Sequence, residues 1–172
     1  MATWSHLIKR FAGSLIPRGP TAEDQAWALG NLLEGEVDIW RRMSRVDRRH
    51  AVGVARRVAV ALESEATRPV LAAALLHDCG KVASGLGTYG RVVATLSAKA
   101  AGTSAAAAWT ETRGFTRRVG LYVQHPELGA EMLGMAGSAP ITVAWAREHH
   151  LPPEDWTVPL QVGEALKEAD DD

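Results

Sequence analysis

The segment LLHDCGK, residues 75–81, decides how the rest of the chain is interpreted. It ends an apolar run, PVLAAALLHD, that opens at Pro69. A proline in the first turn and a glycine at the end are typical of an α-helix. Adjacent helical residues point about 100° apart, so His77 and Asp78 can both face one pocket. A buried pair of this kind is also common as a hydrogen-bonded structural pair, so the pair alone does not define a site.

Helix signals recur along the chain on both sides of this segment. Proline, serine, threonine and acidic residues stand where helices begin, and the apolar spacing between them is helical. The predicted helices run from about 21 to 43, 45 to 65, 69 to 80, 126 to 135, 140 to 150 and 159 to 170. No strand-like alternation and no internal repeat is found in the sequence. The sequence therefore predicts one all-α domain, a bundle of about six to eight helices.

Composition sets limits on the compartment and on the partners. A chain of 172 residues can bury a core without disulfides, and its net charge of -1 argues against an extended nucleic-acid surface. The single cysteine, Cys79, cannot form an internal disulfide, which favours a reducing compartment. The first 20 residues lack the pattern of a secretory signal. We therefore expect a cytoplasmic protein.

The N-terminal 43 residues are expected to form a helical segment packed on the domain. The stretch contains the basic residues Lys9, Arg10 and Arg18. Its apolar residues recur at helical spacing and are Trp4, Leu7, Ile8, Phe11, Leu15 and Ile16. Such spacing is usual for a helix docked on a core, which is the favoured interpretation. A helix lying on a membrane surface would have the same pattern, so peripheral membrane contact stays an alternative.

Residues 82–120 differ in composition from the remainder. They contain the turn-like stretch SGLGTYG and the alanine-rich run AKAAGTSAAAAW. Alanine has a high helix propensity but offers little side-chain volume for packing. Lys99, Thr103 and Ser104 make the run too polar for a membrane span. We expect a lid-like insertion.

The other histidines are placed much as His77 is. His50 lies at the edge of a helical apolar stripe, His125 precedes a helix-starting proline, and His149 and His150 end a helix. Asp170 lies on the flank of the last apolar stripe. Each could be an ordinary surface or core residue, but together they favour a metal cluster. Mixed nitrogen and oxygen ligands suit iron, manganese or zinc, with magnesium possible.

The order of these residues resembles the HD-domain superfamily of metal-dependent phosphohydrolases. HDCGK, residues 77–81, resembles its HD-x-GK signature, and HPELGAEML, residues 125–133, resembles the histidine-led helix start that follows it. The paired histidines resemble those of the HD-GYP branch, whose members hydrolyse cyclic dinucleotides at two- or three-metal sites. The resemblance covers about residues 45–170 and implies an HD-type domain over residues 44–172.

The resemblance also implies roles for individual residues. Asp78 would bridge two metal positions and, with Lys81, be catalytic, and Lys81 would lie near a substrate phosphate. The implied cofactor is one or two divalent ions, and the implied reaction is hydrolysis of a phosphoester of a nucleotide or other small phosphorylated molecule by a metal-activated hydroxide. The implied metal ligands are His50, His77, Asp78, His125, His149, His150 and Asp170.

The sequence departs from the HD-GYP pattern after the paired histidines. The paired histidines continue as HHLPPEDWTVP without Gly-Tyr-Pro, so cyclic-di-GMP is not the expected substrate.

Arginines near the predicted site favour an anionic ligand, and Arg57, Arg117 and Arg118 are the predicted substrate-binding residues. A non-catalytic regulatory HD module that binds a metal and a nucleotide stays open as the alternative.

Overall fold

The computed structural model describes residues 19–171, and every regular element in that range is helical. It contains ten α-helices and four short 3-10 helices, and no strand is found among these residues. The predicted all-α fold is confirmed, with a few more helices than expected. The α-helices are α2 (Ala22–Gly30), α3 (Glu34–Arg42), α4 (Arg45–Leu62), α5 (Arg68–Leu76), α6 (Thr88–Ala101), α7 (Thr103–Ala108), α8 (Gly114–Val123), α9 (His125–Met135), α10 (Pro140–Glu148) and α11 (Leu160–Asp171). The 3-10 helices are η1 (Glu63–Glu65), η2 (Cys79–Ser84), η3 (Trp109–Glu111) and η4 (Pro153–Asp155).

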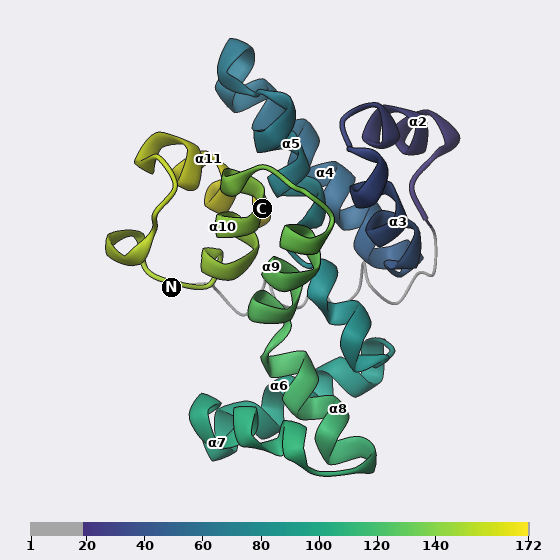
Figure 1. Cartoon of the computed structure of the whole chain (residues 1–172), viewed down its shortest axis with the longest axis vertical. Coiled ribbons are helices and arrows are strands. Elements are labelled where there is room, and N and C mark those ends of the chain that lie inside the picture. The colour runs from purple at the N-terminus through teal and green to yellow at the C-terminus, as the bar shows by residue number, and fades with distance from the viewer. Residues whose placement is uncertain (1–18, 172) are drawn as a thin grey trace.

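The core surrounds α5, whose residues from Val70 to Leu76 are all buried. This helix packs between α4 and α10, while α9 packs on α10 and α11 packs on α4 (Figure 1). A helix that is apolar on every side must be covered on every side. The position of α5 therefore places its C-terminal end, where His77 and Asp78 follow, inside the bundle.

The first predicted helix is wrong in one respect, because the structure divides it into α2 and α3. The Asn31 side chain donates a hydrogen bond to the Trp27 carbonyl at 2.9 Å, at the end of α2. The main-chain N–H of Leu33 donates to the buried Glu36 carboxylate at 2.7 Å, at the start of α3. Two local caps thus end one helix and start the next within an apolar pattern that continues across both.

The described part of the N-terminal segment shares the main core. Trp40 of α3 and Met43, which follows it, are buried together with residues of α4 and α5. The amphipathic helix predicted within residues 1–18 lies outside the described residues. Among residues 19–171, no helix combines the length and the apolar character that crossing a membrane requires.

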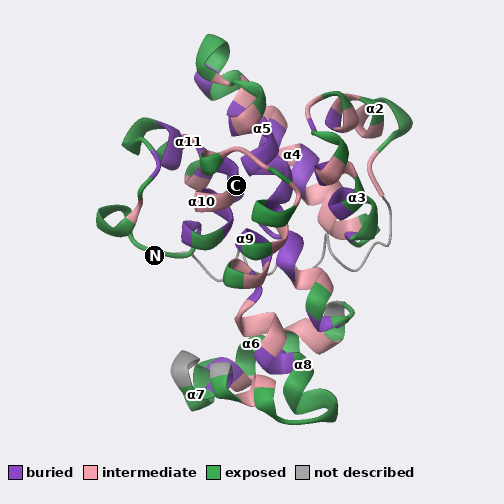
Figure 2. Cartoon of the chain, viewed as in Figure 1, coloured by how far each residue is buried: buried purple, intermediate pink, exposed green. Residues whose placement is uncertain are grey.

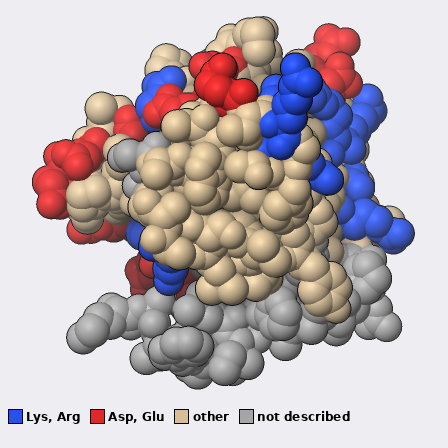
Figure 3. Space-filling model, turned by 90° about the horizontal axis from the view of Figure 1, so that it is seen from below, with Lys and Arg blue, Asp and Glu red and all other residues tan. Residues whose placement is uncertain are grey.

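Helices α6, α7 and α8 form a lobe that extends away from the main bundle (Figure 1). Its hydrophobic cluster is small and is built on Leu86, Ala94 and Val119, and much of its outer surface is exposed (Figure 2). Viewed from this end of the molecule, uncharged residues occupy the centre of the face, between a mainly basic and a mainly acidic flank (Figure 3). The lobe overlaps residues 82–120, and both the insertion and its action as a lid stay predictions.

Gly80 has a different role from the one predicted. We expected it to end the preceding helix, but α5 ends at Leu76 and a 3-10 helix follows. A Cβ atom on Gly80 would lie 2.0 Å from the carbonyl oxygen of His125 and 2.6 Å from the nitrogen of Gly129. Glycine is therefore required for the close packing of η2 on α9. This packing brings Asp78 next to the start of α9.

Candidate metal centre

The structure brings all seven predicted ligands into one cluster. They come from helices that are far apart in the sequence but meet beside the end of α5. Four of them project from helix termini, as the sequence suggested, and the others lie on α4 and where α5 passes into η2. By element they are His50 on α4, His77 and Asp78 after α5, His125 at the start of α9, His149 and His150 at the end of α10, and Asp170 in the last turn of α11.

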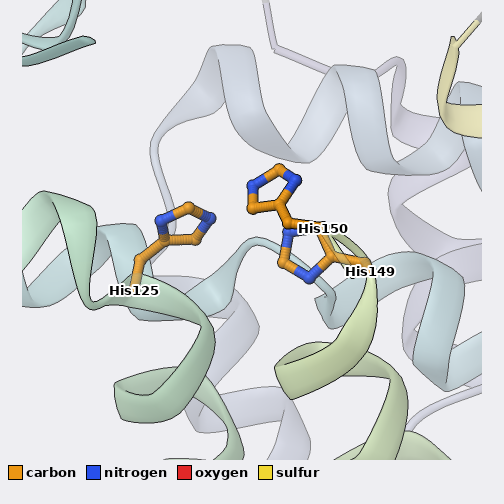
Figure 4. A group of neighbouring side chains, drawn as sticks. All are labelled: His125, His149 and His150. Carbon is orange, nitrogen blue, oxygen red and sulfur yellow. The ribbon is translucent and has the colours of Figure 1, made fainter. Parts of the chain in front are cut away.

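One group of the cluster consists of imidazoles alone. His125, His149 and His150 each offer a ligand atom, and these three atoms lie within 4.8 Å of one another. Figure 4 shows the His125 ring on α9 facing the pair at the end of α10. His125 and His149 are buried, whereas His150 is exposed. The group can therefore hold an ion that is covered on one side and reachable from the other.

The second group mixes imidazoles and carboxylates. His50, His77 and Asp78 also have ligand atoms within 4.8 Å of one another. Asp170 joins them, because its Oδ1 lies 2.8 Å from Nε2 of His50 and 3.5 Å from Nε2 of His77. The last turn of α11 thus supplies a carboxylate to this group.

Asp78 lies between the two groups. Its Oδ1 is 3.3 Å from Nε2 of His125 and 3.6 Å from Nε2 of His149. Its Oδ2 is 3.5 Å from Nε2 of His77, on the other side. A carboxylate with one oxygen toward each group has the geometry required to bridge two ions.

The main chain fixes the orientation of three histidine rings. A carbonyl can only accept a hydrogen bond, so a ring that contacts one through Nδ1 carries a proton there, and in its neutral form it presents the lone pair of Nε2. In each case the carbonyl belongs to the residue three positions earlier. The pairs are His77 with Ala74 at 2.9 Å, His125 with Tyr122 at 2.7 Å, and His149 with Ala146 at 2.9 Å.

The opposite nitrogens of these rings, the Nε2 atoms, have no hydrogen-bond partner in the protein. The Nε2 atoms of His77, His125 and His149 are buried and form no hydrogen bond. Leaving one buried polar atom without a hydrogen bond costs roughly 1–3 kcal/mol, and here three such atoms converge. When the three rings are neutral, their Nε2 lone pairs and the two neighbouring carboxylates form a donor set for metal ions. The residues present therefore fit a divalent cation.

Comparison with protein-family models, curated proteins and solved structures found no match. The resemblance to the HD-domain superfamily accordingly stays a prediction.

Charges are distributed unevenly between the two groups. Burial would lower the pKa of His77, but the carboxylates of Asp78 and Asp170 outweigh it and raise this pKa to about 10. Burial would likewise raise the pKa values of both carboxyl groups, yet neighbouring cations and imidazoles hold them below their ordinary range. Without metal, the His50 side of the centre therefore keeps a proton on His77 between two ionised carboxylates.

The imidazole group behaves in the opposite way. Burial lowers the pKa of His125, and this effect exceeds the favourable contribution of Asp78. Desolvation and the neighbouring His149 and His125 lower the pKa of His150. The rings of His125 and His150 are therefore neutral near pH 7, which is the form that binds metal.

The metal-free protein should lose stability as the pH rises. The pKa of His77 is raised on folding, so its protonation stabilises the fold fully below pH 6.5 and progressively less up to about pH 10. The expected slope approaches about 1.4 kcal/mol per pH unit within this window. Urea unfolding of metal-stripped protein at several pH values measures it, with His77→Gln as the control that removes the dependence. A wild-type curve as flat as that of His77→Gln would contradict the assigned proton.

Lys81 contacts the cluster, whereas two of the predicted arginines turn elsewhere. The ammonium group of Lys81 forms an ion pair with Oδ2 of Asp78. Arg57 donates to the carbonyl of Ala169, and Arg118 donates to main-chain carbonyls at the end of η2. Arg117 is exposed on α8. Substrate binding by the three arginines stays a prediction.

Sequence reasoning missed residues that support the centre. Glu148 is buried beside His149, and its carboxylate accepts hydrogen bonds from the N–H and hydroxyl of Thr157, at 2.8 Å and 2.6 Å. Asp47 on α4 pairs with Arg91 on α6 at 2.6 Å, which joins the lobe to the main bundle. The signal available for Glu148 was its position directly before the paired histidines. Nothing in the sequence pairs Asp47 with Arg91.

Proposed function

We propose that this protein is a metal-dependent phosphohydrolase that cleaves a phosphoester of a nucleotide or another small phosphorylated molecule. The observation that carries the proposal is the pair of adjoining ligand groups that share Asp78. A shared carboxylate is typical of centres in which two ions act on one phosphoryl group. The HD-domain resemblance of the sequence points to the same chemistry.

The ligand types favour a transition metal. One group offers three imidazoles, and the other offers two imidazoles and two carboxylates. This set suits iron, manganese or zinc better than magnesium, which prefers oxygen ligands. When bound, two such ions supply a hydroxide at neutral pH and neutralise charge on a phosphoryl group.

The exposure of the ligands favours catalysis over a purely structural metal site. The side chain of His77 is 2% exposed, whereas that of His50 is 30% exposed and that of His150 lies at the surface. The site therefore has buried ligands on its protein side and more accessible ligands on its solvent side. Catalytic metal sites keep a position open to substrate, whereas structural sites are closed.

Lys81 can supply a cation for the substrate phosphate. Burial would lower the pKa of its ammonium group, but the neighbouring Asp78 raises it, so the group stays charged. Its side chain is 18% exposed and ends at Asp78, between the two ligand groups. Lysine binds phosphate as a point charge, so we assign Lys81 to hold a phosphoryl oxygen beside the centre.

The test is an assay of phosphate release from a panel of nucleotides and simple phosphoesters, with iron, manganese, zinc or magnesium added to metal-stripped protein. We expect metal-dependent hydrolysis that is lost in His77→Gln while helicity is retained. Lys81→Ala is expected to keep the metal but lower the rate. Metal-dependent nucleotide binding without turnover would instead support the non-catalytic regulatory module.

A further inference from the structure

The last turn of α11 carries Asp170, a predicted metal ligand, at a helix end. The final carbonyls of a helix have no partners within the helix, and helix ends fray when nothing caps them. Asp170 lies in this last turn. Its carboxylate must nevertheless be held where it meets His50 and His77.

Arg57 of α4 provides the missing contact. Its Nε donates to the carbonyl oxygen of Ala169 at 3.0 Å, and its Nη2 donates to the same oxygen at 2.7 Å. Arg57 follows His50 by seven residues, so both lie on nearly the same face of α4. One face of α4 therefore contacts Asp170 through His50 and holds the neighbouring main chain through Arg57. A cation at this helix end is also favoured by the helix dipole.

We propose that Arg57 is a positioning residue for the metal centre. By fixing the carbonyl of Ala169, it places the Asp170 carboxylate for the ion on the His50 side. The inference rests on the proposed function, since it assumes that the cluster binds metal. It gives Arg57 a role that differs from the substrate contact predicted from the sequence.

The surroundings of Arg57 make this role testable by chemical rescue. Arg57 and Ala169 line an open cleft of about 420 Å³ between α4 and α11, together with Val60 and Glu168. Shortening Arg57 would enlarge a space that solvent already enters. A guanidinium ion added to the solution could then donate to the Ala169 carbonyl in place of the lost side chain.

The neighbouring arginine offers a matched control. Arg56 lines the same cleft, but it pairs with Asp24 at 3.3 Å and its guanidinium lies 4.0 Å from the ring centroid of Trp27. These contacts hold α2 against α4 and do not involve α11. Arg56→Ala removes the same charge from the same cleft while leaving the last turn of α11 capped.

Metal titration of the stripped protein against a chromophoric chelator should separate the two positions. In Arg57→Ala, we expect one zinc dissociation constant to rise by about 10–100-fold, as is usual when a group that orients a ligand is lost. The other constant should stay as in wild type, because Asp170 does not belong to the imidazole group. In Arg57→Lys, the affected zinc dissociation constant should lie between those of wild type and Arg57→Ala, since lysine lacks the planar fork. Millimolar guanidinium should restore affinity in Arg57→Ala, whereas equal urea should not.

Several outcomes would overturn the inference. Two zinc sites in Arg57→Ala with wild-type affinities would do so while leaving the proposed function intact. Equal weakening of both sites, with lost helicity and no rescue by guanidinium, would show a general structural role. The same loss in Arg56→Ala would attribute the effect to charge alone. A wild-type chain that binds none of zinc, iron and manganese would overturn the proposed function and this inference with it.

Discussion

Replacing Asp78 by asparagine is expected to remove both metal ions and abolish phosphoester hydrolysis. Asp78 directs one oxygen toward His125 and His149 and the other toward His77, so both positions depend on it. An amide offers one neutral oxygen in place of two charged ones. Loss of an orienting group alone costs metal sites 10–100-fold, so loss of the shared ligand should cost more than about 100-fold in affinity.

Metal analysis and phosphate release on the same preparations measure this effect. Asp38→Asn is the matched control, because Asp38 is an exposed carboxylate of α3 that pairs with Arg41. We expect circular dichroism to show unchanged helix content in both variants. An Asp78→Asn protein that keeps two ions, or one that hydrolyses as fast as wild type, would refute the bridging role.

Gly80→Ala is expected to destabilise the protein by about 3 kcal/mol or more, at the upper end of the range for overpacking. The added methyl group would collide with the main chain of α9 at His125 and Gly129, and no flexible side chain is there to move aside. Relief requires η2 and α9 to separate. Separation would also draw His125 away from Asp78, so metal affinity should fall together with stability.

Gly134→Ala provides the comparison. Gly134 is exposed near the end of α9, and a Cβ there would meet nothing within 4 Å. The same change should therefore be neutral or stabilise by up to about 1 kcal/mol through helix propensity. Urea unfolding of metal-free proteins measures both variants. Equal stability of Gly80→Ala and wild type would mean that η2 and α9 are not packed as described.

Much of the fold could be predicted because helix boundaries are local. Pro69, Pro126 and Pro140 stand within the first turn of α5, α9 and α10, as the sequence indicated. The division of α2 from α3 was missed because its caps use Asn31 and Glu36 within a continuous apolar pattern. A local hydrogen bond there overrides periodicity.

The candidate site was predictable in its residue types but not in its supporting contacts. Histidines next to acids at helix ends are visible in the sequence. The carbonyls that orient His77, His125 and His149 are main-chain groups, and no residue type marks them. The contact of Arg57 with α11 depends on which helices become neighbours, and seven-residue spacing from His50 fitted a substrate contact equally well.

The most direct test of the metal centre is the metal content per chain of protein purified without chelators or a histidine tag, before and after reconstitution. Two ligand groups that share Asp78 predict close to two iron, manganese or zinc ions per chain. A value near one would contradict the shared pair. No bound metal after reconstitution with each ion would contradict the centre itself.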